Sequence, residues 1–451
     1  MYSACDPLRT GETAWEAVLV EPLRSQALEA ATLVAERVRE PEHVLAVAEN
    51  AVRQSSITLL PHPASTVFGV GGIALPCTYF AQCFPDQGWD KIAHHYLEPQ
   101  KQPHPLNGPG LYSMTSGMAL IVSLLSENGK RYRKTLDNLH TLLCDQVAQL
   151  PTRPDGSNGV AEREYDLVSG VTGVLAYLLT LIEPGEQERA AAERLLTYLI
   201  DLAGIDQASG RHHWYVAQQF IVMPDRKKDF PEGYYNCGLA HGIPGPLAVL
   251  ALAWQAGYRT AGLYEAISTL SNWLLQHSVV DNWGINWPDV VPIPQSHTRE
   301  EWKMVPATRA AWCYGAPGIA RALWFAGLTL EDTSLCQTAL EAMEAVLRRP
   351  IAVRGIDSPI LCHGIAGLLA ICLRFYHDTR RESIGAHIPL LVSQILSHFN
   401  PEYPLGFRDL ETATVSVDWT NWLTGSPGTA LALLAAALPV EPQWDRIMLL
   451  S

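Results

Sequence analysis

One pattern recurs seven times along the chain: a Gly-x-x-Gly turn, or a close relative of it, followed by a run of Leu, Ala, Ile and Val. The intervals between the turns are long enough to hold one further helix each. Glycine at these turns lets one backbone approach another where a Cβ atom would obstruct it. The repeat therefore predicts a succession of packed helical hairpins. The seven turns are Gly69–Gly72, Met114–Gly117, Gly170–Gly173, Gly242–Gly245, Gly315–Gly318, Gly364–Gly367 and Gly425–Gly428, of which the second has lost its first glycine.

The two kinds of segment in each repeat differ in their predicted burial. The runs after the turns, such as Leu247–Trp254 and Ala430–Ala437, are apolar on nearly every side, which predicts buried helices. The intervening stretches, such as Glu186–Leu202 and Asp332–Leu347, carry the charges and are amphipathic with a helical period. An inner ring of apolar helices within an outer ring of amphipathic ones is an all-α fold, an (α/α)7 toroid. We expect it to span residues 1–451 as one domain.

Residues 204–233 depart from this helical pattern. Arg211–Val222 is rich in β-branched and aromatic residues, and the charged run Asp225–Asp229 follows it. This composition predicts a small β-rich excursion within the helical domain. Such an excursion could recognise a peptide, and it could equally serve as a lid or a brace.

The composition restricts the class of partner. Hydrophobic residues make up 48% of the chain and charged residues 17%, which is typical of a well-folded globular protein. The formal net charge of -14 argues against nucleic acid or an anionic membrane surface as the main partner, because both would repel the protein. The first residues lack the features of a secretory signal, and no run reaches the roughly 18 apolar residues of a membrane span. We therefore expect a cytoplasmic protein with no transmembrane segment.

Two of the glycine turns carry short cysteine and histidine motifs, Trp-Cys-Tyr-Gly and Leu-Cys-His-Gly. Cys313 and Cys362 each stand two residues before the first glycine of their turn, so the repeat places them at equivalent positions. Adjacent residues on a regular helix diverge by about 100°, so Cys362 and His363 reach one ion only from the irregular turn before the helix. Two thiolates and one imidazole are the ligand set of a catalytic zinc that keeps one coordination position open. The sequence therefore predicts a Zn²⁺ site formed by Cys313, Cys362 and His363.

Cys237 and His241 offer a competing ligand pair, because they lie four residues apart. That spacing would serve a metal only if the stretch were helical. Gly238 and Gly242 argue against a helix there. We therefore leave Cys237 out of the predicted ligand set.

Four segments give the chain a strong resemblance to the LanC family of lanthipeptide cyclases. They are Tyr165–Gly173, Asn236–Gly245, Arg309–Gly315 and Cys362–Gly364. The resemblance covers nearly the whole chain, and the pairing of Cys-Tyr-Gly with Cys-His-Gly is its most specific part. It implies a seven-hairpin toroid with a zinc ion at one end of the cavity.

The resemblance also implies an activity and a set of site residues. The family joins a cysteine thiol of a precursor peptide to a dehydroalanine or dehydrobutyrine of the same peptide, which gives a lanthionine or methyllanthionine ring. A dehydrated precursor peptide would be the substrate, with a separate dehydratase and an exporter as partners, in a biosynthetic complex that could sit at the membrane surface. By similarity the zinc ligands are Cys313, Cys362 and His363, and the active site is lined by His241, Arg309, Asp166 and Tyr314.

The chemistry of these residues agrees with that activity. Coordination to zinc deprotonates a thiol whose ordinary pKa is near 8.5, so the metal supplies a nucleophile at neutral pH. Addition to the β-carbon builds an enolate and requires a proton at the α-carbon. Arg309 is a candidate to stabilise the enolate, and His241 a candidate acid or base whose tautomer or pKa Asp166 would set. For Arg309 the alternative is a structural salt bridge, for Asp166 a helix cap, and the role of Tyr314 stays open.

Several other functions are compatible with parts of this pattern. A LanC-like enzyme could add glutathione to dehydroamino acids, and a non-catalytic scaffold could use zinc for stability while it binds peptides. A protein prenyltransferase would need a carboxylate in its zinc set, which we do not find beside these cysteines. A toroidal glycosidase would need paired acids and has no use for the Cys-His pair. No region for a dehydratase fits within the chain, which favours a stand-alone cyclase.

Overall fold

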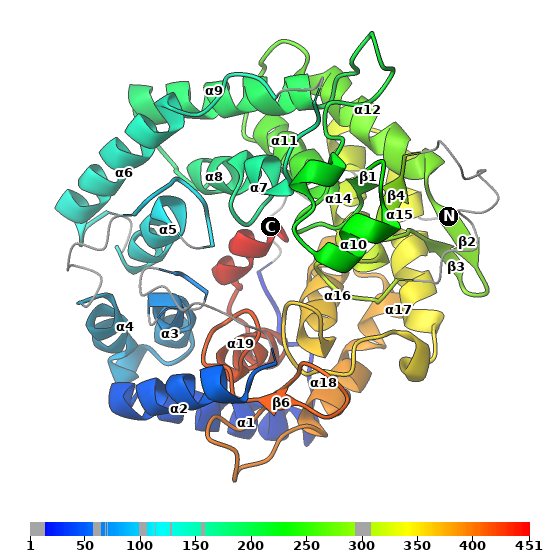
Figure 1. Ribbon diagram of the computed structural model, residues 1–451. Helices are drawn as coiled ribbons and strands as arrows, with labels where there is room; N and C mark the ends of the chain where they lie inside the picture. The colour runs from blue at the N-terminus through cyan, green and yellow to red at the C-terminus, as the bar shows by residue number, and fades with distance from the viewer. Residues whose placement is uncertain are drawn as a thin grey trace. The chain divides into compact units, whose positions relative to one another are not determined.

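The computed structural model describes residues 14–451 except 57–64, 68, 70, 99–105, 113, 127–128, 155–157 and 294–307. The chain forms two compact units, each with buried hydrophobic residues of its own. Figure 1 labels the helices and strands. Unit 1 contains residues 108–111 and 140–354, and unit 2 contains the described part of residues 9–107 together with residues 112–139 and 355–451. Helices dominate both, as the prediction of an all-α fold requires.

Unit 1 is built from helices and two pairs of short strands. β1 (Tyr234–Asn236) pairs antiparallel with β4 (Val290–Pro292), and β2 (Val279–Asp281) pairs antiparallel with β3 (Gly284–Asn286). α11 packs on α8, α12 and α14. The helices are α7 (Glu162–Tyr165), α8 (Val171–Leu178), α9 (Glu186–Leu202), α10 (Pro224–Asp229), α11 (Pro244–Gln255), α12 (Leu263–Gln276), α14 (Ala316–Leu330) and α15 (Thr333–Arg348), and the 3-10 turns are η3 (Gln218–Phe220) and η4 (Ile351–Val353).

Unit 2 joins segments from both ends of the sequence. α19 packs against α1, α3 and α16, and β5 (Asp409–Leu410) pairs with β6 (Ser416–Val417). The helices are α1 (Leu23–Val38), α2 (Pro41–Gln54), α3 (Gly71–Cys83), α4 (Trp89–Leu97), α5 (Thr115–Leu125), α16 (Ile365–Thr379), α17 (Glu382–Gly385), α18 (Ile388–Leu396) and α19 (Ser426–Ala437), with η1 (Pro85–Gln87) and η5 (Gln443–Met448) as 3-10 turns. α6 (Arg133–Ala148) contributes residues to each unit.

A buried helix follows each glycine turn, as the repeat predicts. α3, α5, α8, α11, α14, α16 and α19 begin at the seven turns, and most of their residues are buried on every side. The turns are tight because the glycine backbone lies against backbone atoms of the residues about six positions earlier. A Cβ atom on Gly173 would clash with the carbonyl oxygen of Leu167, and one on Gly428 with that of Trp422. The predicted role of the glycines in close backbone approach is confirmed at these positions.

The intervening helices are amphipathic, which is also as predicted. α9 has the predicted bounds Glu186–Leu202 and buries one face through Leu195, Leu196 and Leu199. α15 is capped by Asp332, whose carboxylate accepts hydrogen bonds from the backbone N–H groups of Ser334 and Leu335. No helix in the described part of the chain is long and apolar enough to cross a membrane.

Residues 204–233 differ from the predicted β-rich excursion. They form turns, η3, α10 and two isolated bridges, Ile205 with His212 and Val216 with Tyr234, and contain no strand. The aromatic residues that suggested strands instead pack on one another. The ring of Trp214 stacks on His212 with centroids 4.0 Å apart and meets Trp273 edge-on. The aromatic residues of this segment are therefore explained by their packing in a buried cluster and not by strand pairing.

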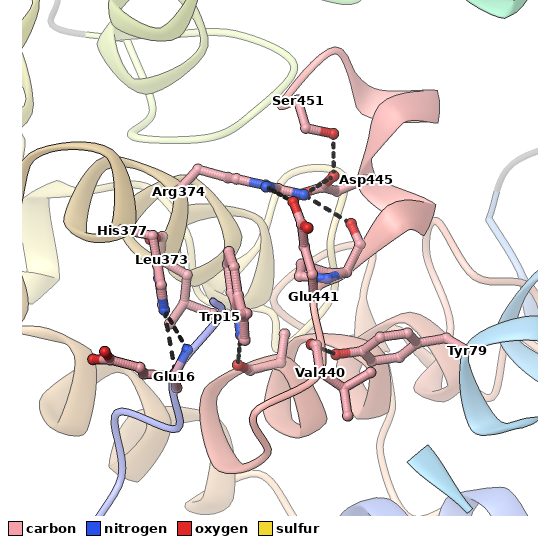
Figure 2. Close-up of polar contacts among 12 residues, drawn as sticks. Trp15, Glu16, Tyr79, Leu373, Arg374, His377, Val440, Glu441, Asp445 and Ser451 are labelled. Atoms are coloured by element: carbon pink, nitrogen blue, oxygen red, sulfur yellow. Dashed lines mark hydrogen bonds and ion pairs between the residues drawn. The ribbon is translucent and has the colours of Figure 1, made fainter. Parts of the chain in front are cut away.

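Unit 2 is closed by polar contacts between its first and last described segments and α16, shown in Figure 2. Arg374 is buried and forms a bidentate pair with Asp445, at 2.6 and 2.9 Å, and a further ion pair with Glu441 at 2.8 Å. The ring of Trp15 stacks on His377 at 3.7 Å, and its Nε1 donates to the carbonyl oxygen of Ala435. The segments that follow α19 and precede α1 are therefore fixed to α16.

Candidate active site

Asp166 and His241 form a close pair in unit 1. Asp166 lies between α7 and α8, and its Oδ1 accepts hydrogen bonds from the backbone N–H groups of Ser169 and Gly170 at 2.7 and 2.8 Å. Its Oδ2 lies 2.7 Å from Nδ1 of His241. Because an ionised carboxylate only accepts, Nδ1 carries the proton and Nε2 is the unprotonated nitrogen of the neutral ring. Asp166 therefore both caps its turn and orients His241.

The environment of His241 favours its charged form. Burial of the ring lowers the pKa, but the hydrogen bond that the ring donates to Asp166 and the negative charge of Asp166 raise it, with smaller contributions from Glu162 and Cys313. The net direction is a pKa above the ordinary value. The side chain of His241 is 39% exposed whereas that of Asp166 is 3% exposed, so the histidine is the accessible member of the pair. Within the described residues no hydrogen bond occupies its Nε2.

The loop that carries His241 packs directly on Cys313 and Tyr314. The N–H of Ala240 donates to the carbonyl oxygen of Cys313 at 3.5 Å. A Cβ atom on Gly238 would lie 2.6 Å from Cε1 of Tyr314 and 2.7 Å from the carbonyl oxygen of Cys313, so only glycine allows this contact. Unit 1 therefore brings together four of the predicted residues: Asp166, His241, Cys313 and Tyr314.

A polar network behind Tyr314 was not predicted. Asn236, at the end of β1, is fully buried and donates from Nδ2 to Oε1 of Glu162 at 2.5 Å and to the hydroxyl oxygen of Tyr314 at 3.0 Å. Tyr234 also donates to Oε1 of Glu162, at 2.9 Å. Burial is the main cause that raises the pKa of Tyr314, and the charge of Glu162 adds to it. Tyr314 is therefore a neutral phenol.

Two arginines belong to the part of unit 1 that contains Tyr314 and Asp289. Arg309 is exposed, and it makes no hydrogen bond or ion pair with another described residue. Arg226, from α10, stands over the ring of Tyr314 at 5.8 Å from its centroid. Burial raises the pKa of Asp289, and the charges of Arg226 and Arg309 partly oppose that rise. The charged run in residues 204–233 was the one sequence signal for Arg226.

Cys313 lies in an irregular turn directly before α14, as predicted. Its side chain is buried, with 8% of the residue exposed. The turn is held by Gly315, whose φ of 111° is accessible chiefly to glycine and whose missing Cβ would clash with the carbonyl oxygen of Arg309. Cys237 is buried, and burial raises the pKa of its thiol.

Cys362 and His363 lie in the equivalent turn of unit 2, directly before α16. The N–H of Cys362 donates to the carbonyl oxygen of Leu423 at 2.9 Å. Nε2 of His363 is 3.6 Å from Oδ1 of Asp409, a side chain that is 2% exposed on β5. Ser358 donates to the same Oδ1 at 2.8 Å. The buried carboxylate of Asp409 thus faces Nε2 of His363.

The three predicted zinc ligands are thus divided between the units, Cys313 in unit 1 and Cys362 with His363 in unit 2. Within either unit, the described residues contain no group of three or more His, Cys, Asp or Glu side chains that could hold a metal ion. The donor types fit zinc, since two thiols and an imidazole with a carboxylate behind it are common in zinc sites. Both cysteines remain thiols rather than halves of a disulfide.

Comparison with known proteins assigns the family. The family model described as "Lanthionine synthetase C-like protein" matches residues 61–449, and the chain belongs to this family. A relative is "Nisin biosynthesis protein NisC" of Lactococcus lactis subsp. lactis, which is 26% identical over 325 residues that cover 69% of this chain and 75% of the relative. The solved structure of "Nisin cyclase" matches with a TM-score of 0.73 at 22% identity, over 91% of this chain and 96% of that one. This likeness shows the fold, and the predicted fold class is confirmed.

Proposed function

We propose that the protein is a zinc-dependent lanthipeptide cyclase. It would add cysteine thiols of a precursor peptide to dehydroalanine or dehydrobutyrine residues of the same peptide. The observation that carries this proposal is the oriented Asp166–His241 pair packed beside Cys313, in a chain of the lanthionine synthetase C-like family whose relative is a nisin biosynthesis protein. The pair provides a proton-transfer group next to a thiol ligand.

Cys313, Cys362 and His363 would hold the Zn²⁺. A bound zinc ion would lower the pKa of the substrate thiol so that it is a thiolate at neutral pH. Asp409 would orient His363 through Nε2, as carboxylates behind histidine ligands do in other metal sites. The equivalent positions of the two cysteines in their turns support this ligand set.

The chain's own residues would manage charge and protons. In the addition, the substrate sulfur forms a bond to the β-carbon, the carbon–carbon double bond becomes an enolate, and a proton then joins the α-carbon. His241 is accessible and its pKa is raised by Asp166, so it can deliver that proton near neutral pH. Arg309 is an exposed cation four residues before Cys313 and would face the anionic acceptor.

The substrate fixes the partners. Dehydroamino acids arise when serine and threonine side chains lose water, so a dehydratase must act before this enzyme. A dehydrated precursor peptide is the proposed substrate, and an exporter would remove the cyclised product. These partners would work beside the protein in a biosynthetic complex.

A thiol-counting assay tests the proposal. Cyclisation leaves the peptide mass unchanged but removes one thiol per ring, so alkylation after incubation with a dehydrated, cysteine-containing peptide counts the rings. We expect rings with the native protein and none with Cys362→Ala, while Cys144→Ala, outside the site, retains activity. Glutathione added to a dehydroalanine peptide without cysteine should react slowly. Preferred addition of glutathione, or equal activity of Cys362→Ala, would overturn the proposal.

A further inference from the structure

We propose that Asn236 is a positioning residue that fixes the Tyr314 hydroxyl as a hydrogen-bond donor to the reacting dehydroamino acid. The inference rests on the proposed cyclase function for the identity of the acceptor. Its structural part, the direction of the Tyr314 hydrogen bond, stands on contacts within unit 1 alone. Tyr314 would then have a definite role beside Cys313.

The orientation of the Asn236 amide is fixed by its surroundings. Oδ1 accepts a hydrogen bond from the backbone N–H of Gly238 at 2.8 Å. The opposite amide orientation would bring an NH2 group against that N–H and an oxygen against the carboxylate of Glu162, so it is excluded. Nδ2 therefore faces Glu162 and Tyr314.

Both hydrogens of Nδ2 are used in this orientation. One goes to Oε1 of Glu162 at 2.5 Å and the other to the hydroxyl oxygen of Tyr314 at 3.0 Å. A phenol has a single hydrogen, and Tyr314 cannot return it to a group that is itself a donor. The Tyr314 hydrogen must therefore point elsewhere, and no described residue accepts it.

The ring of Tyr314 cannot turn away from this arrangement. It lies directly against Gly238, where a Cβ would approach within 2.6 Å of the ring, and the Arg226 guanidinium is 5.8 Å from the ring centroid. The backbone of Cys313 is hydrogen-bonded to Ala240, next to His241. Tyr314 is thus held next to Cys313, a proposed zinc ligand, and against the loop that carries His241, the proposed proton donor.

A fixed donor at this place matches the need of the reaction. When the thiolate adds to the β-carbon, negative charge moves to the carbonyl oxygen of the dehydroamino acid. A hydrogen bond from a preorganised O–H stabilises that charge in the transition state more than in the ground state. Tyr314 keeps its proton throughout, and His241 supplies the proton that joins the α-carbon.

Reversal of the network's polarity tests the proposal. In the double variant Glu162→Gln/Asn236→Asp, the glutamine amide donates to the new carboxylate, which retains the hydrogen bond from Gly238 but can only accept from Tyr314. The shape is kept while the Tyr314 hydrogen is drawn inward. We expect kcat to fall on the order of 100-fold with little change in KM, as in Tyr314→Phe. Glu162→Gln alone serves as the reference for the lost charge, and Tyr235→Phe on the same strand is the matched tyrosine control.

Adding Tyr314→Phe to the polarity-reversed double variant should cost nothing further, because the hydroxyl is already withdrawn. Additive losses, or a double variant as fast as Glu162→Gln, would overturn the proposal. A difference vibrational spectrum, native minus Tyr314→Phe, gives a readout independent of activity. The Tyr314 hydroxyl should accept a hydrogen bond from the residue at position 236 in the native protein and donate one to that residue in the reversed variant. If the native protein forms no thioether, the proposed function fails, and this spectrum alone then decides the hydroxyl's direction.

Discussion

Among single residues, Asp166 has the clearest effect, because its carboxylate orients the ring of His241. The sequence motifs named both residues through the family resemblance, and their contact at 2.7 Å agrees with the expected tautomer control. Asn236 lies in the same family segment as His241, but the residue types of that segment do not show that the Asn236 amide bridges Glu162 and Tyr314. The sequence did not single out Arg226 either, because only the placement of the short helix α10 decides which of its charged side chains lies over Tyr314.

Asp166→Asn should shift the pH dependence of the cyclase reaction. The carboxylate stabilises the imidazolium of His241, so its removal lowers the folded-state pKa of the histidine. The limb of the kcat profile that His241 governs should therefore move to lower pH. Steady-state rates across pH check this, and an unchanged or raised apparent pKa would contradict the role given to Asp166.

Asp409→Asn should weaken zinc binding while the fold is retained. The buried carboxylate lies 3.6 Å from Nε2 of His363 and would orient the ring in the proposed zinc site; loss of such a partner lowers metal affinity about 10–100-fold. Competition with a chromophoric chelator measures the affinity. Asp357→Asn, a change at an exposed aspartate six residues before His363, is the control. Equal affinities of the two variants would show that Asp409 has no such role.

At the scale of the element, the glycine turns were the most predictable feature. The period of the repeat and the apolar runs predicted the buried helices correctly, and α9 has the predicted bounds. Both features are predictable because a helix buried on all sides and an amphipathic helix differ in the pattern of their residue types. Residues 204–233 were not predictable in the same way. Aromatic and β-branched residues suit both strands and packed clusters, and only tertiary contacts such as Trp214 with Trp273 decide between them.

Gly318→Ala should destabilise the native state by roughly 1–3 kcal/mol, because the new Cβ would collide with the carbonyl oxygen of Trp312 and force the turn apart. Gly185→Ala is the matched change, since its Cβ would meet only the flexible carboxylate of Glu188. Urea unfolding of both variants gives the comparison. A Gly318→Ala midpoint no lower than that of Gly185→Ala would contradict the packing account.

For the molecule as a whole, the all-α class and the family could be predicted from the sequence, but the contacts that fasten residues 15–16 and 441–451 to α16 could not. Arg374 lies in the middle of a mostly buried helix, and the sequence around it gives no sign of its partners. The structure shows that it pairs with Asp445 and Glu441, far along the chain. Such a pairing depends on the path of the terminal segment, which no local pattern determines.

Asp445→Asn should lower stability by about 3–5 kcal/mol, because it leaves the buried Arg374 charge without its main partner. The ion pair between Arg380 and Glu16 is partly exposed, and Arg380→Gln should change stability by less than about 1 kcal/mol. Chemical denaturation followed by circular dichroism measures both. Similar losses in the two variants would contradict the distinction between the buried and the exposed pair.

We propose that Cys313, Cys362 and His363 bind one zinc ion that serves the thioether-forming reaction. Metal analysis of the purified protein, with zinc-edge absorption spectroscopy to count sulfur ligands, is the decisive experiment. We expect one zinc per chain with two protein sulfurs, loss of that zinc in Cys313→Ala and in Cys362→Ala, and its retention in Cys144→Ala. A full zinc content in either of the first two variants, or a native protein that forms rings without zinc, would contradict it.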